Sequence, residues 1–226
     1  AIPLGLNWVF SKVDQCIILE DDCVPSRSFF DYCAQLLNYY QDDPQIMMIG
    51  GHRFDGPDEF NQDSYFFSKY PSTWGWATWK RAWELFDLQM SEWPALKRTD
   101  WLENILNNSL YESYWTRIFD QMISGMDAWD YALLFSCWLH KGLSIRPKVN
   151  LIHNIGHNAF ATHTTQENQL ISSRHAKEIE FPLRHPDKIE CNLNTEERLE
   201  WVSYSGILER TLSLIHNEIQ SRKSAS

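Results

Sequence analysis

Apolar residues follow two alternating patterns along the chain, short unbroken runs and longer stretches with helical spacing. The runs at 16–20 and 45–51 have the length of buried strands. The stretches at 2–13 and 26–43 repeat apolar residues every three or four positions, which is typical of helices that bury one face. This alternation predicts an α/β fold in which helices flank a sheet.

The rest of the chain extends the same pattern. A polar loop at 54–63 precedes an expected edge strand at 64–70. The remaining predicted elements are helices at 99–107, 110–124 and 129–141, a strand, proline turn and second strand or loop within 143–156, and a helix at 194–220. Because there is no internal repeat and no linker-like run, we expect one domain over 1–190 and a helical C-terminal extension over 191–226.

The chain is acidic, with 20 lysine and arginine residues against 30 aspartate and glutamate residues and a net charge of −10. This balance argues against a broad surface for nucleic acid or anionic lipid, so we expect no nucleic-acid partner. An anionic ligand would need a metal ion, a helix N-terminus or a few placed cations. No apolar run approaches the length of a bilayer, so no transmembrane segment is expected.

The cysteines indicate whether the protein resides in a reducing or an oxidising compartment. They are odd in number, contain no CxxC pair and stand mostly in apolar runs, at Cys16, Cys23, Cys33, Cys137 and Cys191. Reduced thiols fit this usage better than a disulfide framework or a zinc site. The expected location is the cytoplasm, either free or at the inner face of the membrane.

The most unusual stretch is the carboxylate triplet Glu20, Asp21 and Asp22, directly after an apolar run. Three adjacent negative charges repel one another, so the arrangement is costly unless a cation or proton sits among them. The end of a sheet strand is where open α/β folds bind ligands, and carboxylate oxygens suit Mg²⁺ or Mn²⁺. The alternative is a solvated strand end that caps the helix expected after Pro25.

Aromatic residues gather in the segment from 72 to 87, where Trp74, Trp76, Trp79 and Trp83 stand within ten residues. Flat rings stack well on the apolar faces of sugars, although tryptophan more often serves as core. Because neighbours on a strand point to opposite faces, we expect one of Trp74 and Trp76 to meet a ligand and the others to be buried. Gly75 indicates close approach of a ligand or neighbouring backbone.

Three histidines, His153, His157 and His163, surround Gly156 in a late loop. A histidine there could complete a metal shell or contact phosphate, and we favour His163 because hydroxyl residues flank it. Two alternatives remain open, a zinc site and ordinary hydrogen-bonding histidines. Arg146, upstream, could hold phosphate or simply end a strand.

Four segments in this order resemble a known family: "IILEDDCVPSRSFFDYCAQLLNYYQDDPQIMMIGG", "WGWATWKRAW", "AWDYALL" and "IRPKVNLIHNIGHNAFATHT". They are similar to the bacterial nucleotide-diphospho-sugar transferases of the GT-A class, family 2-like, and in motif order to the animal β-1,2-N-acetylglucosaminyltransferases. The resemblance covers most of residues 1–190. It implies a Rossmann-like GT-A fold, a mixed sheet flanked by helices.

The resemblance also implies the roles of individual residues. Asp22 would ligate Mn²⁺ or Mg²⁺, which stabilises the departing diphosphate of a UDP-sugar. Asp130, directly after a tryptophan and at an expected helix start, would take the proton of the acceptor hydroxyl. The implied donor-binding residues are Glu20, Asp21, Trp76, Trp129 and His163. For Asp130 the alternative is a carboxylate that serves the helix dipole, a role for which Asp127 is a rival.

The chain departs from this family in two places. Only about twenty residues precede Asp21, whereas a nucleotide-binding half would need roughly ninety. That half is therefore expected to be absent, which leaves open whether the chain is a fragment and whether it is active alone. The animal enzymes carry "SRT" at the place after Pro147, and this chain does not. We therefore expect a different acceptor and do not infer an N-glycan substrate.

The function that we expect is metal-dependent transfer of a sugar from a nucleotide diphosphate to a hydroxyl of a glycan or glycoside, with inversion. A carbohydrate-binding module without chemistry, built on the eleven tryptophans, is the main alternative. An aspartate-based phosphohydrolase is a third hypothesis, and it lacks a convincing lysine and second acidic pair.

Overall fold

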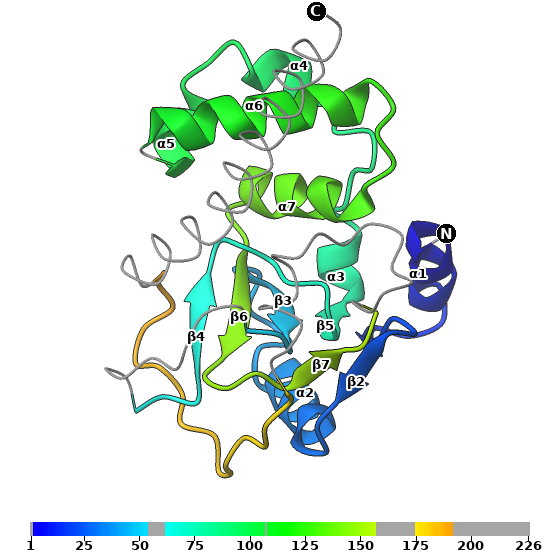
Figure 1. Ribbon diagram of the computed structural model, residues 1–226, viewed down its shortest axis with the longest axis vertical. Coiled ribbons are helices and arrows are strands. Elements are labelled where there is room, and N and C mark those ends of the chain that lie inside the picture. The colour runs from blue at the N-terminus through cyan, green and yellow to red at the C-terminus, as the bar shows by residue number, and fades with distance from the viewer. Residues whose placement is uncertain (1, 54–61, 107, 157–174, 192–226) are drawn as a thin grey trace, which may run out of the picture.

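The computed structural model describes residues 2–53, 62–106, 108–156 and 175–191. Figure 1 shows the sheet with helix α7 above it, and α4, α5 and α6 beyond α7. The predicted helix at 194–220 and nearly all of the loop at 54–63 lie outside the described residues. Over these ranges no helix is both long and apolar enough to cross a membrane.

The main sheet is mixed and has five strands. In spatial order they are β1 (Gln15–Ile18), β5 (Trp76–Trp79), β3 (Ile46–Gly50), β6 (Leu143–Pro147) and β4 (Tyr65–Ser68). Only β3 and β6 pair in parallel, and the other three pairings are antiparallel. The α/β class with a mixed sheet flanked by helices, predicted from the sequence, is confirmed, whereas the GT-A identity stays a prediction.

A separate two-stranded ribbon joins two distant parts of the chain. Strand β2 (Cys23–Pro25) pairs antiparallel with β7 (Ile152–Asn154), with Cys23 opposite Asn154. The sequence predicted a helix start at Pro25 and Ser26, and this was wrong because Pro25 belongs to β2. The ribbon lies directly after the acidic triplet, so it fixes where that triplet points.

Seven helices are found among the described residues. They are α1 (Ile2–Phe10), α2 (Ser28–Tyr39), α3 (Lys80–Trp83), α4 (Trp93–Leu96), α5 (Trp101–Leu106), α6 (Ser109–Ile123) and α7 (Trp129–Leu139). The predicted helices at 99–107, 110–124 and 129–141 correspond to α5, α6 and α7. The short helices α3 and α4 were not predicted.

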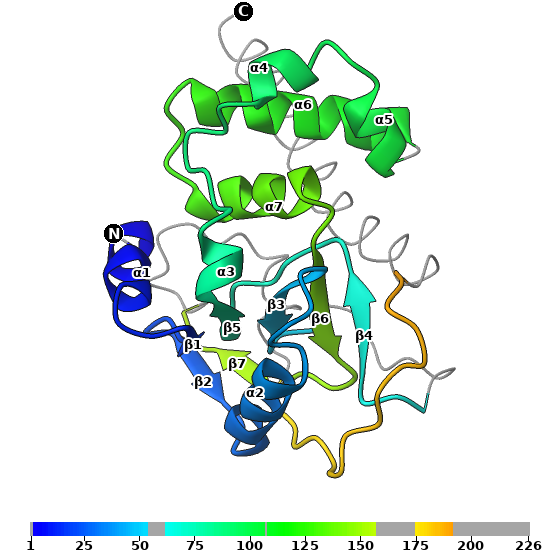
Figure 2. The same ribbon diagram turned by 180° about the vertical axis from the view of Figure 1, so that it is seen from behind.

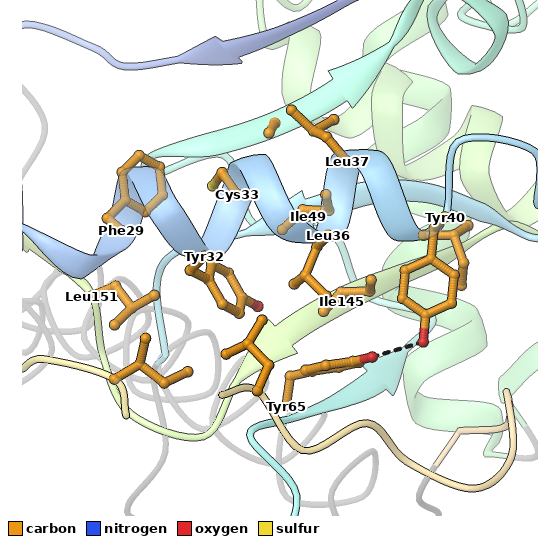
Figure 3. Packing of buried hydrophobic residues seen from close by; sticks show 14 of the residues in the cluster. Phe29, Tyr32, Cys33, Leu36, Leu37, Tyr40, Ile49, Tyr65, Ile145 and Leu151 are labelled. Atoms are coloured by element: carbon orange, nitrogen blue, oxygen red, sulfur yellow. Dashed lines mark hydrogen bonds between the residues drawn. The ribbon is translucent and has the colours of Figure 1, made fainter. Parts of the chain in front are cut away.

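Helix α2 covers one face of the sheet because its apolar residues share one side. Leu36 of α2 and Ile145 of β6 are fully buried in this core, which also contains Tyr65 of β4 (Figure 3). Helices α1, α3 and α7 cover the other face, where Met48, Trp76 and other buried residues pack. Burial on both faces explains why β3 is apolar throughout.

A third core holds the helical layer together. Its buried residues come from β4, the segment after it and helices α4 to α7, and include Trp93, Trp115, Phe119, Phe135 and Trp138. Phe119 lies 5.4 Å from Phe135, ring centroid to centroid, in an edge-to-face contact. Most tryptophans of the chain therefore serve packing.

The two edges of the sheet differ from the prediction. Strand β1 was expected to be buried, but it lies at an edge, and its residues are exposed or half-buried. Strand β4 is an edge strand as predicted, yet all four of its residues are buried. The segment 175–191, which we call the strap, runs beside β4 in Figures 1 and 2, and its Cys191 bridges to Phe67.

Candidate functional site

The acidic triplet forms a tight turn between β1 and β2. The backbone N–H of Cys23 donates to the carbonyl of Glu20 at 3.1 Å and closes the turn. Glu20 and Asp22 are half-buried, whereas Asp21 is exposed. The sequence thus places three carboxylates at one corner of the sheet, as predicted for a strand end.

Asp22 is held by Cys23 of β2 and by the two residues that follow β7. Its Oδ1 accepts a hydrogen bond from the Cys23 thiol at 3.4 Å. Its backbone carbonyl accepts from the N–H of Ile155, just after β7, at 2.8 Å. At Gly156 an added Cβ would lie 3.1 Å from the Asp22 Cγ and closer still to its Oδ2. Gly156 is therefore a site residue, because any side chain there would displace the carboxylate.

Asp130 reaches the same region from a helix more than a hundred residues further along the chain. It lies in the first turn of α7, after Trp129. The pKa of Glu20 is raised by burial first, and then by the negative charges of Asp22, Asp130 and Asp21. For these charges to act on Glu20, each of the three carboxylates must lie near it. The structure thus places Asp130 near Glu20 of the acidic turn, while the roles predicted for these residues stay predictions.

Asp130 combines exposure to solvent with a raised pKa. Its side chain is reached by solvent, while the surrounding protein removes part of its hydration. Burial raises the pKa of the Asp130 carboxyl above its usual value, and the N–H groups of Asp130 and Tyr131 oppose this rise. A carboxylate with a raised pKa is a stronger proton acceptor than an ordinary one.

Two tryptophans stack at the start of α7. Trp76 of β5 and Trp129 stack with ring centroids 5.9 Å apart and planes inclined by 26°. Trp76 is only 1% exposed, so its ring has no free face, and its Nε1 is buried without a hydrogen-bond partner among the described residues. Trp74 is half-buried, which makes it the better candidate to meet a sugar.

Close approach at Gly75 connects the sheet to the ribbon. Gly75 has φ of +61°, and an added Cβ would collide with the Ile152 side chain of β7. Its carbonyl accepts a hydrogen bond from the N–H of Gly51 at 2.7 Å. The close neighbour predicted for Gly75 is thus a protein side chain, and this contact fixes β7 on the sheet.

The histidine predictions are only in part within the described structure. His157 and His163 lie outside the described residues. His153 lies in β7, and its ring centroid is 5.0 Å from that of His175. In the described parts of the chain, no group of three or more histidine, cysteine or acidic residues is arranged to hold a metal ion.

This donor set is compatible with magnesium or manganese rather than with a structural zinc. Mg²⁺ keeps several waters and is often bound through one or two carboxylates and the phosphates of a substrate. Asp22, half-buried and held on both sides, fits the part of a single protein ligand. A structural zinc would need three or four protein ligands.

Arg146 is part of the sheet. It lies in β6, is 1% exposed and donates from Nη1 to the carbonyl of Tyr70 at 3.3 Å. Of the two roles that the sequence left open, a strand residue within the core fits this position better than a phosphate ligand.

Comparison with known protein families and with curated proteins finds no match to this chain. Half-buried carboxylates beside an accessible base can bind a cation with its anionic ligand and can accept a proton from a hydroxyl.

Proposed function

We propose that the protein is a metal-dependent glycosyltransferase that moves a sugar from a UDP-sugar to a hydroxyl of a glycan or glycoside. One observation carries the proposal: Asp130, at the start of α7, lies close enough to the acidic turn for its charge to act on Glu20. A base beside a cation-binding carboxylate is what transfer to a hydroxyl requires. The resemblance of the sequence motifs to GT-A transferases supports the same function.

In this reaction Asp130 accepts the proton of the acceptor hydroxyl while that oxygen forms its bond to the anomeric carbon. The bond between this carbon and the diphosphate oxygen breaks, and its electron pair leaves with the diphosphate. Attack opposite the leaving group inverts the configuration. A bound Mn²⁺ or Mg²⁺ would supply Lewis-acid stabilisation of the diphosphate.

Separate residues would bind the cation, contact the donor and position the base. Asp22 would hold the cation, and Glu20 and Asp21 would contact the ribose and sugar of the donor. The Trp76–Trp129 stack fixes the start of α7 and hence Asp130. Of the implied donor-binding residues, Trp129 is half-buried, and Trp76 supports it by stacking on its ring. The role of His163 stays a prediction.

Replacement of the base tests this proposal. We expect Asp130→Asn to lower the rate of transfer by about 10²- to 10⁴-fold, because it removes general-base catalysis. UDP release from UDP-glucose, UDP-galactose and UDP-N-acetylglucosamine would be measured with p-nitrophenyl glycosides as acceptors. Asp127→Asn, an exposed carboxylate just before α7, is the matched control. Equal rates for Asp130→Asn and the wild type would remove Asp130 from the mechanism.

The raised pKa of Asp130 predicts how the rate of transfer changes with pH. Because only the carboxylate form of Asp130 accepts a proton, the rate should rise with pH as Asp130 ionises. Its raised pKa moves the midpoint of this rise above the ordinary value of 3.8. Initial rates from pH 4 to pH 8 would show this limb. A rate that falls over this whole range would contradict Asp130 as the base.

The alternative of a tryptophan-lined binding module is less favoured. Six of the eleven tryptophans are buried and cannot line a sugar groove: Trp76, Trp79, Trp83, Trp93, Trp115 and Trp138. Such a module would bind glycans equally with and without EDTA. The proposed transferase would lose donor binding when EDTA removes the cation.

A further inference from the structure

The strap, residues 175–191, is attached at several points to elements far away in the sequence. The N–H of Ile179 donates to Oγ of Ser28 at 2.9 Å. Arg184 and Ser64 exchange two hydrogen bonds of 2.9 Å, one from the Arg184 N–H to Ser64 Oγ and one from the Ser64 N–H to the Arg184 carbonyl. Ile179 and Leu183 are buried in the core under α2.

One anchor of the strap is Glu178 at the N-terminus of α2. Its two carboxylate oxygens accept from the backbone N–H groups of Ser28 at 2.8 Å and Arg27 at 3.2 Å. These are helix N-terminal donors that would otherwise lack a protein partner. The hydrogen bonds from Ser28 and the positive charge of Arg27 lower the pKa of Glu178. The anchor therefore holds the strap at neutral pH and in mild acid.

The other anchor is His185. Its ring stacks on Tyr39 of α2 with centroids 4.1 Å apart and planes inclined by 7°. Its Nδ1 lies 2.6 Å from the hydroxyl of Tyr65, which lies 2.7 Å from the hydroxyl of Tyr40. Figure 3 shows the Tyr40–Tyr65 bond at the end of the core. His185 thus ends a chain of two phenols that begins in the core.

Protonation of His185 disturbs the hydrogen bonds that link it to Tyr65 and Tyr40. In the neutral ring Nδ1 can accept from the Tyr65 hydroxyl, but a protonated Nδ1 can only donate. The Tyr65 hydroxyl would have to turn toward Tyr40, whose own proton would then need a new acceptor. Burial also disfavours the charged ring and lowers the pKa of His185.

No carboxylate offsets this cost within the described structure. The groups that face His185 are the phenols of Tyr39 on α2 and Tyr65 on β4, which are neutral at physiological pH. Arg184 and Asp187 are its nearest charged neighbours along the strap, and both are exposed. The docked strap therefore prefers a neutral His185.

The strap is also connected to the acidic turn. The N–H of Lys177 donates to the carbonyl of Asn150 at 2.7 Å. The buried Asn150 side chain accepts from the N–H of Arg53 and donates to the carbonyl of Ile152 in β7. The N–H of Ile155, just after β7, then donates to the carbonyl of Asp22. A continuous set of contacts therefore links the strap to Asp22.

We propose that protonation of His185 releases the strap, and that this release loosens the β2–β7 ribbon beside Asp22. His185 contributes to docking above its ordinary pKa of 6.5, and this contribution is lost as the pH falls toward its lowered value. The contribution of Glu178 to docking is lost only in stronger acid, below its ordinary pKa of 4.5, because its pKa in the folded protein is lowered. Of these two anchors, mild acid therefore acts on His185. The inference does not depend on the transfer reaction.

Hydrogen exchange of the whole chain, followed by mass spectrometry, tests this inference. Protection factors at pH 7.5 and pH 5.5 are compared after correction for the intrinsic pH dependence of exchange. In the wild type we expect protection of 177–184 to fall about threefold or more at pH 5.5, since each unit of pKa shift is worth up to tenfold. Protection of 150–156 should fall in parallel, and that of α7 should not.

Two variants make the result specific. His185→Gln cannot be protonated, so the protection of 177–184 should be independent of pH even if it is lower throughout. His140→Gln, at an exposed histidine after α7, should behave as the wild type. The inference is overturned if the wild type shows no fall, or if His185→Gln shows the same fall. A fall at 177–184 with none at 150–156 overturns the link to Asp22.

Discussion

At the scale of residues, the site depends on how little space surrounds Asp22. Its carboxylate contacts Gly156 on one side and accepts from the Cys23 thiol on the other. Burial raises the pKa of Cys23 to about 12, so the thiol stays protonated and remains a donor. This packing leaves Asp22 few orientations, which is the condition for holding a cation in a defined place.

Gly156→Ala should therefore disturb the site without disturbing the fold. The new methyl group would collide with the Asp22 carboxylate, so we expect Mn²⁺-dependent binding of UDP to weaken at least tenfold, or about 1.4 kcal/mol. Isothermal titration calorimetry measures the binding, and the melting temperature measures the fold.

Gly5→Ala is the matched control for this variant. Gly5 lies in α1, and an added Cβ there meets nothing within 4 Å. Alanine should stabilise α1 by roughly 0.5–1 kcal/mol and leave UDP binding unchanged. Equal UDP affinity in Gly156→Ala and the wild type would show that the contact with Asp22 is unimportant.

At the scale of elements, the strap completes helix α2. No side chain at the start of α2 caps it, and the cap comes instead from Glu178. The chain therefore stabilises this helix with a residue about 150 positions away.

Glu178→Ala should lower the melting temperature at pH 7, because the N–H groups of Arg27 and Ser28 lose their acceptor. The lowered pKa of Glu178 sets the sign of the pH dependence: the stabilisation is present above 4.5 and is lost as the pH falls through the lowered value. The difference from the wild type should therefore shrink in strong acid. Glu180→Ala, also exposed on the strap, should have little effect. Equal melting temperatures for the two variants would contradict the capping role.

Elements with many periodic residues could be predicted from the sequence. Helices α2, α6 and α7 have 11 to 15 residues and bury one or more apolar faces, so their spacing was visible. Strands β2 and β7 have three residues each, and their pairing joins Cys23 to Asn154. Such a contact leaves no local pattern, which is why the pairing was missed, although a second strand or loop was predicted within 143–156.

At the scale of the whole molecule, the fold brings the acidic turn after β1 to the start of α7. Asp130 comes near Glu20 because β1 pairs with β5, and Trp76 of β5 packs against Trp129. The strand order could not be predicted, since it depends on packing between distant segments. The role of Gly156 was missed for the same reason, although a glycine after a short strand was a visible signal.

The central claim is that Asp22 binds a divalent cation together with the diphosphate of a nucleotide. Isothermal titration of the protein with UDP, in Mn²⁺ and again in EDTA, tests it most directly, with Asp22→Asn and the exposed control Asp42→Asn beside the wild type. We predict that UDP binds to the wild type and to Asp42→Asn in Mn²⁺, and that binding is lost in EDTA and in Asp22→Asn. Binding of UDP that is equal in Mn²⁺ and EDTA, or unaffected by Asp22→Asn, would contradict the account.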